Sequence, residues 1–205
     1  MGRTLLSSPE PSELRDLDDG ELVARCLRAG EHYDAAFEQL YARHASRVFG
    51  FLLKLTGNRS AAEDALQETF LRVYKSLERF DARRSLSAWL LQIARYVAID
   101  AYRVEKKVRR LEERRAAENP EGTRGEVEGE AERNERERVV GEVLAELSIE
   151  DRSLLLLRHF EGMTFREIGE AIDCSARTAQ NRVEAAARRF QRALKGRRIV
   201  GRGDL

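Results

Sequence analysis

Two adjacent helical patterns occupy Thr164 to Lys195, and a turn of Asp173-Cys174-Ser175 separates them. Thr164 and Glu167 have the spacing of a capping box, which predicts a helix start at this point. Ser175 can accept a hydrogen bond from the free amides of the second helix, so we expect it to be the N-cap. The apolar positions of that helix recur at three- and four-residue steps: Ala176, Ala179, Val183, Ala186, Phe190 and Ala193. Such a stripe packs inward and predicts two helices that cross closely.

The other face of the second helix is polar and basic. Between Cys174 and Arg202, nine Lys and Arg residues stand against Glu184 alone, which gives a net charge of +8. Base-edge donors lie near the start of this helix and cations able to reach phosphates lie behind them, which is the order that insertion into a major groove requires. A solvated basic face on an ordinary amphipathic helix is the alternative interpretation. The pattern favours a helix-turn-helix that binds duplex DNA, and the candidate contacts are Ser175, Arg177, Thr178, Asn181, Arg182, Arg188 and Arg189.

Charge is segregated along the chain, although the total over 205 residues is only +1. Ala116 to Leu147 holds ten Glu against four Arg, a net charge of −6, with Pro120, Gly122, Gly125 and Gly129 interspersed. Such a composition cannot bury a core, so it predicts a flexible acidic linker over residues 114–136. The linker divides the chain into two small domains, residues 19–113 and residues 137–195.

Repeated three- and four-residue apolar spacing, with no alternating strand pattern, predicts an all-α chain. No apolar run is long enough to cross a membrane and the N-terminus lacks a signal-peptide profile, so we expect a cytoplasmic protein without membrane insertion. Cys26 and Cys174 do not suggest a disulfide framework or a zinc site, and His32, His44 and His159 lack ligand spacing. No phosphate-binding loop or catalytic motif is present. We therefore expect no metal, no cofactor and no enzymatic activity.

The N-terminal domain contains a second capping-box pattern, Ser60 to Glu63, which predicts a helix start. The buried side of this helix is expected to hold Leu66, Phe70, Val73 and Leu77. Its outer face carries one apolar residue among acceptors: Asp64, Gln67, Glu68 and Leu71. An exposed apolar residue surrounded by polar groups is typical of a protein interface, although a single exposed Leu is also common.

A short cationic loop, Phe80 to Ser85, follows and leads into a helix predicted from Leu86 to about Arg103. Aromatic and basic side chains alternate in this region, including Phe80, Trp89, Tyr96, Arg84 and Arg95. Stacking surfaces combined with cations are typical of single-stranded nucleic-acid binding. The alternative is that the aromatic residues belong to the core and the Arg residues are solvated, which applies above all to Trp89.

Several runs of the N-terminal domain together resemble region 2 of the bacterial extracytoplasmic-function (ECF) sigma factors, group 4 of the sigma-70 family. These runs are Phe37 to Tyr41, Ala62 to Tyr74, Phe80-Asp81 and Ala88 to Arg95. The C-terminal domain resembles their region 4 in Leu147 to Arg158, Glu161 to Thr164, Glu167 to Glu170 and Thr178 to Val183. The resemblance covers about Asp19 to Leu194, and the two motif sets stand in the expected order.

The resemblance implies a dissociable subunit that directs RNA polymerase core to promoters and starts DNA-templated transcription. It implies that the face of Asp64, Gln67, Glu68 and Leu71 binds polymerase, and that the recognition helix reads duplex DNA at the minus-thirty-five element. The loop and following helix would capture an extruded base of the melted minus-ten element. The candidate residues there are Phe80, Arg83, Arg84, Ser85, Trp89, Gln92, Arg95 and Tyr96. An anti-sigma factor is a further implied partner, expected to wedge between the two domains and cover both surfaces.

Tyr96 and Asp173 depart from the family pattern, whereas Gly169 keeps it. Tyr96 stands where many relatives have Asn, so the preferred minus-ten base cannot be transferred to this chain. Gly169 occupies a small-residue site at the helix crossing, and Asp173 takes a turn position often filled by Gly, which Asp tolerates at positive φ. The alternative function is a helix-turn-helix transcription regulator that never engages polymerase core.

Overall fold

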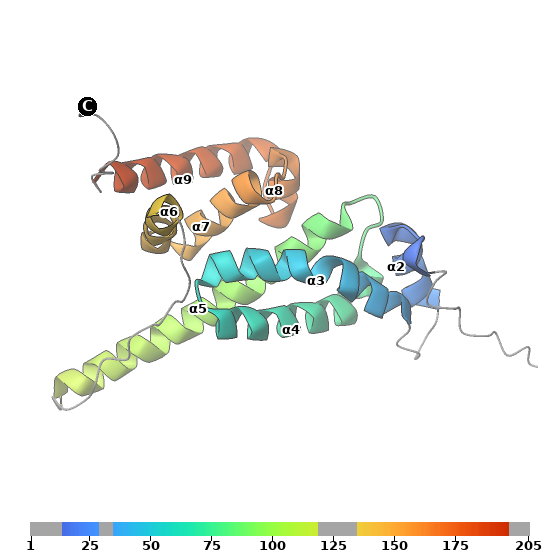
Figure 1. Ribbon diagram of the computed structural model, residues 1–205, viewed down its shortest axis with the longest axis horizontal. Helices are drawn as coiled ribbons and strands as arrows, with labels where there is room; N and C mark the ends of the chain where they lie inside the picture. The colour runs from blue at the N-terminus through green and yellow to red at the C-terminus, as the bar shows by residue number, and fades with distance from the viewer. Residues whose placement is uncertain (1–13, 29–34, 119–134, 197–205) are drawn as a thin grey trace, which may run out of the picture.

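The computed structural model describes residues 14–28, 35–118 and 135–196, and these residues contain helices but no strand (Figure 1). The predicted all-α fold is therefore confirmed for the described part of the chain. The elements in order are α2 (Asp19–Arg28), α3 (Ala35–Thr56), α4 (Arg59–Ser76), η1 (Leu77–Arg79), α5 (Leu86–Glu118), α6 (Glu135–Glu146), α7 (Ile149–Leu155), η2 (Leu156–Phe160), α8 (Phe165–Ala171) and α9 (Ala176–Gly196).

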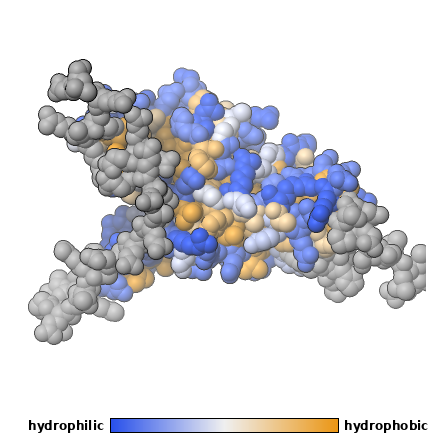
Figure 2. Space-filling view, in the orientation of Figure 1, coloured by the Kyte–Doolittle hydropathy of each residue, from blue (hydrophilic) through white to orange (hydrophobic). Residues whose placement is uncertain are grey.

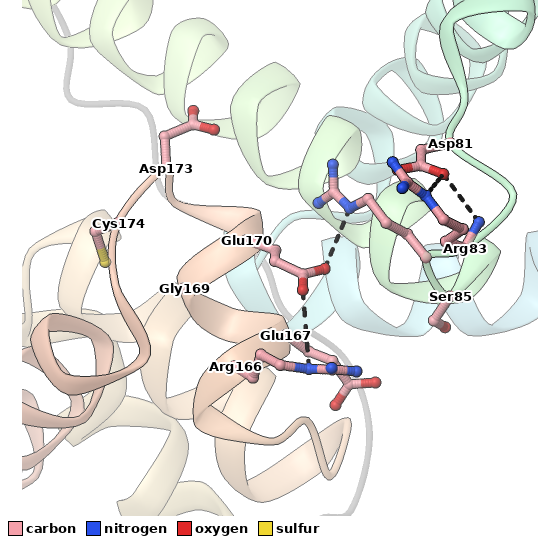
Figure 3. A pocket seen from close by; sticks show the side chains of 10 residues that line it. Asp81, Arg83, Ser85, Arg166, Glu167, Gly169, Glu170, Asp173 and Cys174 are labelled. Atoms are coloured by element: carbon pink, nitrogen blue, oxygen red, sulfur yellow. Dashed lines mark hydrogen bonds and ion pairs between the residues drawn. The ribbon is translucent and has the colours of Figure 1, made fainter.

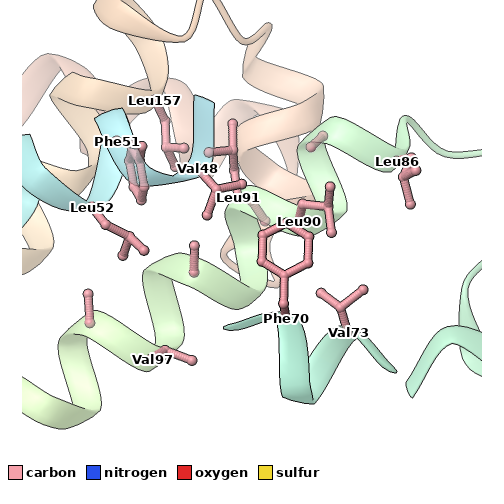
Figure 4. Close-up of a cluster of buried hydrophobic side chains, with 14 of the residues drawn as sticks. Val48, Phe51, Leu52, Phe70, Val73, Leu86, Leu90, Leu91, Val97 and Leu157 are labelled. Atoms are coloured by element: carbon pink, nitrogen blue, oxygen red, sulfur yellow. The ribbon is translucent and has the colours of Figure 1, made fainter. Parts of the chain in front are cut away.

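The first lobe is built from α3, α4 and the N-terminal half of α5, which contact one another pairwise, while α2 packs on α3. Its interior is formed by large apolar side chains with almost no exposed surface, such as Phe51, Leu52 and Leu90 (Figure 4). Phe37 meets Phe70 edge-on, with 6.4 Å between the ring centroids. Apolar burial of this kind holds the three helices as one unit.

The second lobe is formed by α6 to α9, with α6, α7 and α8 all in contact with α9. Thr164 caps α8 as expected, because its side chain accepts from the Glu167 amide and the Glu167 side chain accepts from the Thr164 amide. Between α7 and α8 the chain makes one π-helical turn, η2, in which the Glu161 amide donates to the Leu156 carbonyl at 2.9 Å. This wider turn brings the chain to the start of the helix-turn-helix.

The two lobes are in direct contact. The interior of one continues into the other, since Leu157 of η2 lies beside Val48 and Phe51 of α3 in a single apolar cluster (Figure 4). Helix α5 of the first lobe also contacts α7 and α8 of the second. The sequence predicted two lobes but gave no indication of this contact between them. The acidic stretch 119–134 lies outside the described residues.

Two expected helix boundaries were wrong. Helix α4 begins at Arg59 and is capped by Asn58, whose side chain accepts from the Ala61 amide, so Ser60 lies inside the helix rather than at its cap. Gly57, at φ 71°, ends α3 and leaves Asn58 in the extended conformation that an N-cap needs. Helix α5 runs to Glu118 instead of ending near Arg103, and so takes in the first residues assigned to the linker.

The remaining sequence expectations concern membranes and thiols. Among the described residues, no helix is both long and apolar enough to cross a membrane. Cys26 and Cys174 are not joined in a disulfide, and His32 lies outside the described residues. Figure 2 shows one face of the molecule, where an apolar area in the middle is surrounded by hydrophilic residues.

Candidate nucleic-acid interface

The leading end of α9 presents an exposed polar surface. Arg177, Asn181 and Arg182 are all exposed, and their side chains make no hydrogen bond or ion pair with other described residues. Ser175 and Thr178 are used differently, because the Ser175 hydroxyl accepts from the Thr178 amide at 3.1 Å and lies 2.9 Å from the Thr178 hydroxyl. These two candidate contacts therefore cap the helix, and the donors left for a ligand are the two Arg residues and Asn181.

Arg188 and Arg189 lie further along α9 and differ from each other. Arg189 donates to both carboxylate oxygens of Asp151 on α7, at 2.8 and 3.0 Å. The side chain of Asp151 is only 16% exposed, so this pair fastens α9 to α7. Arg188 has a long contact of 3.9 Å to Glu184 one turn earlier and remains exposed. Of these two candidates, Arg188 is better placed to reach a phosphate.

The turn between α8 and α9 is tight because Gly169 permits it. A Cβ atom at Gly169 would lie 2.7 Å from the Cys174 carbonyl oxygen, closer than real Cβ contacts allow. The amide of Cys174 donates to the Gly169 carbonyl at 2.8 Å and closes the turn. Asp173 has φ 52°, the left-handed conformation expected for it. The sequence expectations for both residues are confirmed.

In the first lobe, Asp81 shapes the cationic loop. Its carboxylate accepts from the Arg83 amide at 3.0 Å and from the Arg83 guanidinium at 2.8 and 2.9 Å, while its carbonyl accepts from the Arg84 amide. The hydrogen bonds from Arg83 lower the pKa of Asp81 to about 2. Arg83 is almost fully exposed but turned back onto its own loop. Sequence reasoning missed this role of Asp81, although an Asp that bonds the amide two residues on is a recognised turn signal.

Arg84, Gln92 and Tyr96 lie together where the loop and α5 face the second lobe. Arg84 donates to the Gln92 side chain at 3.2 Å and to the Glu170 carboxylate at 3.1 Å. The Tyr96 hydroxyl donates to the Asp173 carboxylate at 2.6 Å. Burial and the nearby Asp173 carboxylate raise the pKa of Tyr96. A polar cleft opens here, between the Asp81 to Ser85 loop and α8 with its following turn (Figure 3).

The other minus-ten candidates make contacts within the first lobe or with the second lobe. Phe80 and Trp89 are half-buried and pack on each other, with ring centroids 5.0 Å apart. Ser85 caps α5, because its hydroxyl accepts from the Ala88 amide at 3.3 Å. Arg95 is buried, and its guanidinium donates to the Ser153 hydroxyl of the second lobe at 2.9 Å. Burial lowers the pKa of Arg95.

The outward face of α4 remains open to solvent. Leu71 is 53% exposed, Asp64 and Gln67 are exposed, and Glu68 is half-exposed. The Glu68 carboxylate accepts from Arg72 one turn later, at 2.7 Å. All four candidate polymerase contacts thus lie on one side of one helix, apart from the contacts between the lobes.

Sequence reasoning also missed Arg152, which is 9% exposed and lies at the boundary of the lobes. Its guanidinium donates to three backbone carbonyls, those of Leu144 and Ala145 in its own lobe and that of Leu55 in the other, at 2.8, 2.8 and 2.7 Å. No local signal marks the contact to Leu55, because that carbonyl lies 97 positions away in the sequence. No group of His, Cys, Asp and Glu within the described ranges could hold a metal ion.

Comparison with known proteins finds a separate family match in each lobe. Residues 40–108 match the family Sigma-70 region 2, and residues 137–195 match Sigma-70, region 4. The chain is 32% identical over 159 residues to the RNA polymerase sigma factor CarQ of Myxococcus xanthus, covering 78% of this chain and 89% of CarQ. It is 29% identical over 175 residues to the ECF RNA polymerase sigma factor SigK of Mycobacterium tuberculosis, covering 85% of this chain and 94% of SigK.

Two solved structures have a similar fold. One is the sigma factor RpoE in complex with the anti-sigma factor NepR from Bartonella quintana, with a TM-score of 0.57, 21% identity and coverage of 79% of this chain and 98% of that chain. The other is CnrH in complex with the cytosolic domain of CnrY, with a TM-score of 0.60, 23% identity and coverage of 87% of this chain and 97% of that chain.

Proposed function

The chain belongs to the ECF sigma factors of bacterial RNA polymerase, and from that membership we propose how its two lobes divide promoter recognition. A sigma factor directs polymerase core to specific promoters and so starts DNA-templated transcription. The first lobe would bind core and the minus-ten element, and the second would bind the minus-thirty-five element. The alternative, a regulator that never engages core, is not favoured, because the relatives named as sigma factors align over both lobes.

The polymerase contact is assigned to the outward face of α4. The observation that carries this assignment is Leu71, an apolar side chain more than half exposed on a helix face where Asp64 and Glu68 are its neighbours. Apolar contact would supply affinity, and the acceptors would select a basic partner surface. Because this face lies apart from the contacts between the lobes, it is open in the free protein.

The two DNA contacts are assigned to different surfaces. Arg177, Asn181 and Arg182 on α9 have the bidentate donors that read base edges in a major groove. Arg84, Gln92 and Tyr96, beside the cationic loop, offer donors and an aromatic ring to a single strand. Nothing in this division requires bond-making chemistry by the chain itself, so we propose that it acts as an initiation factor without catalysis, in the cytoplasm with the polymerase.

An anti-sigma factor is a further proposed partner. RpoE and CnrH, which share the fold, were each solved with a bound protein. In this chain the lobes already touch through Leu157 and the surrounding apolar residues. A partner that reaches between the lobes would therefore have to separate them first, whereas one that covers α4 would not.

Charge reversal on α4 tests the polymerase assignment. Replacing Asp64 and Glu68 by Lys places like charges against a basic partner, so we expect affinity for purified core to fall by at least about 100-fold. The matched control replaces Glu105 and Glu112 by Lys, which changes the net charge equally on an exposed part of α5. Fluorescence anisotropy of labelled protein titrated with core measures both variants. Equal affinity of the Asp64/Glu68 variant and the unchanged protein would show that the surface is assigned wrongly.

A further inference from the structure

The cationic loop before α5 carries two arginines whose partners differ. Arg83 donates to both oxygens of the Asp81 carboxylate, from Nε at 2.9 and 3.2 Å and from Nη2 at 2.8 Å (Figure 3). Arg84 donates instead to the Gln92 side chain on α5 and to the Glu170 carboxylate of the second lobe. Arg83 is therefore paired inside its own loop, whereas Arg84 contacts other elements.

Asp81 also fixes the backbone turn of this loop. Its carboxylate accepts from the Arg83 amide at 3.0 Å, and its carbonyl accepts from the Arg84 amide at 2.9 Å. The hydrogen bonds from the side chain and the amide of Arg83 lower the pKa of Asp81 to about 2, so the carboxylate is charged at neutral pH. An Asp that bonds the amide two residues on stabilises a turn. One side chain thus sets both the turn and the position of the Arg83 guanidinium.

The pair alters the charge that the loop presents to a ligand. Arg83 keeps donors on Nη1, so it can still contact a phosphate. The Asp81–Arg83 pair is neutral as a whole, however, and a phosphate that approaches Arg83 also approaches the Asp81 carboxylate. Affinity for nucleic acid comes largely from cations that neutralise phosphates and release their counterions. An arginine that is already compensated adds little to this attraction.

We propose that Asp81 is a positioning residue for the minus-ten strand: it holds the loop in its turn and compensates Arg83, so that Arg83 adds little charge to the binding of a single strand. The inference rests on the proposed minus-ten assignment, in which this loop faces DNA. Asp81 acts through Arg83 and the backbone and touches no DNA itself. Phosphate contacts carry no sequence information, so this compensation leaves a larger share of the binding to base contacts.

Two substitutions of Asp81 separate its two roles. Asp81→Asn keeps an oxygen that can accept from the Arg83 amide but removes the negative charge. Asp81→Ala removes both. Arg83→Gln and the double variant Asp81→Asn/Arg83→Gln complete a mutant cycle. The matched control is Glu78→Gln, which removes the same charge from an exposed carboxylate three positions earlier.

Trp89 reports the order of the loop. It is the only Trp of the chain, and its ring packs on Phe80, next to Asp81, with ring centroids 5.0 Å apart. Acrylamide quenching of Trp89 fluorescence should increase in Asp81→Ala and stay unchanged in Asp81→Asn. Equal quenching in the unchanged protein and Asp81→Ala would show that this side chain does not hold the loop.

Salt dependence reports the compensation of Arg83. The probe is a fluorescein-labelled oligothymidine of about 20 nucleotides, and its anisotropy is followed at several salt concentrations during titration with the full chain. One added phosphate contact steepens the slope of log affinity against log salt by about 0.7 for a single strand. We expect this steepening in Asp81→Asn and almost no change in Arg83→Gln or Glu78→Gln. The double variant should return to the slope of the unchanged protein.

A slope that flattens by about 0.7 in Arg83→Gln, or that is equal in Asp81→Asn and the unchanged protein, would overturn the inference. Trp89 emission during the same titration tests the minus-ten assignment separately. Binding without any change in that emission, or no binding at the lowest salt concentration, would refute the assignment and the inference together. Changed emission with the contrary slopes would refute the role of Asp81 alone. None of these readings depends on polymerase.

Discussion

Two buried arginines, Arg95 and Arg152, differ in the acceptors to which their guanidinium groups donate. Arg152 satisfies its guanidinium with three backbone carbonyls, which offset much of the cost of removing a charge from water. Its third acceptor, the Leu55 carbonyl, belongs to the other lobe, so a structural residue of region 4 also ties the lobes together. Arg95 relies on a neutral hydroxyl. We infer that Arg152 acts mainly in stability, whereas Arg95 is the residue that gains most from a new anionic partner.

On α9, position along the helix should separate base reading from phosphate contact. Arg177 lies at the leading end, so Arg177→Ala should relax preference at one or two base pairs and cost roughly 1–3 kcal/mol there. Arg192 is exposed several turns later, so Arg192→Ala should weaken all duplexes alike and flatten the salt dependence. Binding of the isolated holoenzyme to a panel of minus-thirty-five variants at several salt concentrations measures both. A uniform loss from both substitutions would contradict this division.

At the scale of elements, the crossing of α8 and α9 depends on the absence of a side chain at Gly169. Gly169→Ala would drive a Cβ into the Cys174 carbonyl, so we expect it to destabilise the second lobe by about 1–3 kcal/mol. Gly141, exposed in α6 with no atom within 4 Å of the place that a Cβ would take, is the matched control. Gly141→Ala should be neutral or stabilising by up to about 1 kcal/mol, because alanine favours the helix. Urea unfolding measures both, and equal stability of the two variants would remove the steric argument.

Local signals predicted the helix-turn-helix well. The capping box at Thr164, the Ser175 cap and the positive φ of Asp173 all follow from local side-chain and backbone preferences, and the structure has all three. The same reasoning misplaced the start of α4, because Asn58 and Ser60 are both good caps and the choice depends on where Gly57 ends α3. It also ended α5 too early, where ion pairs such as Glu105 with Arg109 continue the helix and the apolar residues Val104, Val108 and Leu111 remain exposed.

The contacts between the lobes could not be predicted from the sequence. Tyr96 and Asp173 are 77 positions apart, and neither carries a local pattern that points to the other. Sequence patterns therefore identified candidate DNA contacts on each lobe separately. They did not identify the hydrogen bonds that join side chains of the two lobes. The outward face of α4 could be identified from the pattern of one helix. The hydrogen bonds at the minus-ten surface depend on contacts between the two lobes, so they required the whole fold.

At the scale of the whole molecule, two recognition units are in direct contact. The α4 face is open to solvent in this arrangement. The α9 donors Arg177, Asn181 and Arg182 are likewise exposed, while the minus-ten side chains are held.

Run-off transcription with purified core polymerase tests the central claim most directly. Templates would carry upstream regions from the native host, and the reactions would compare core alone, core with this chain and core with the Asp64→Lys/Glu68→Lys variant. We expect discrete transcripts of defined length only when the unchanged chain is present. Transcription that does not depend on the added chain, or a chain that binds promoter duplex yet never yields a transcript with core, would contradict its assignment as a sigma factor.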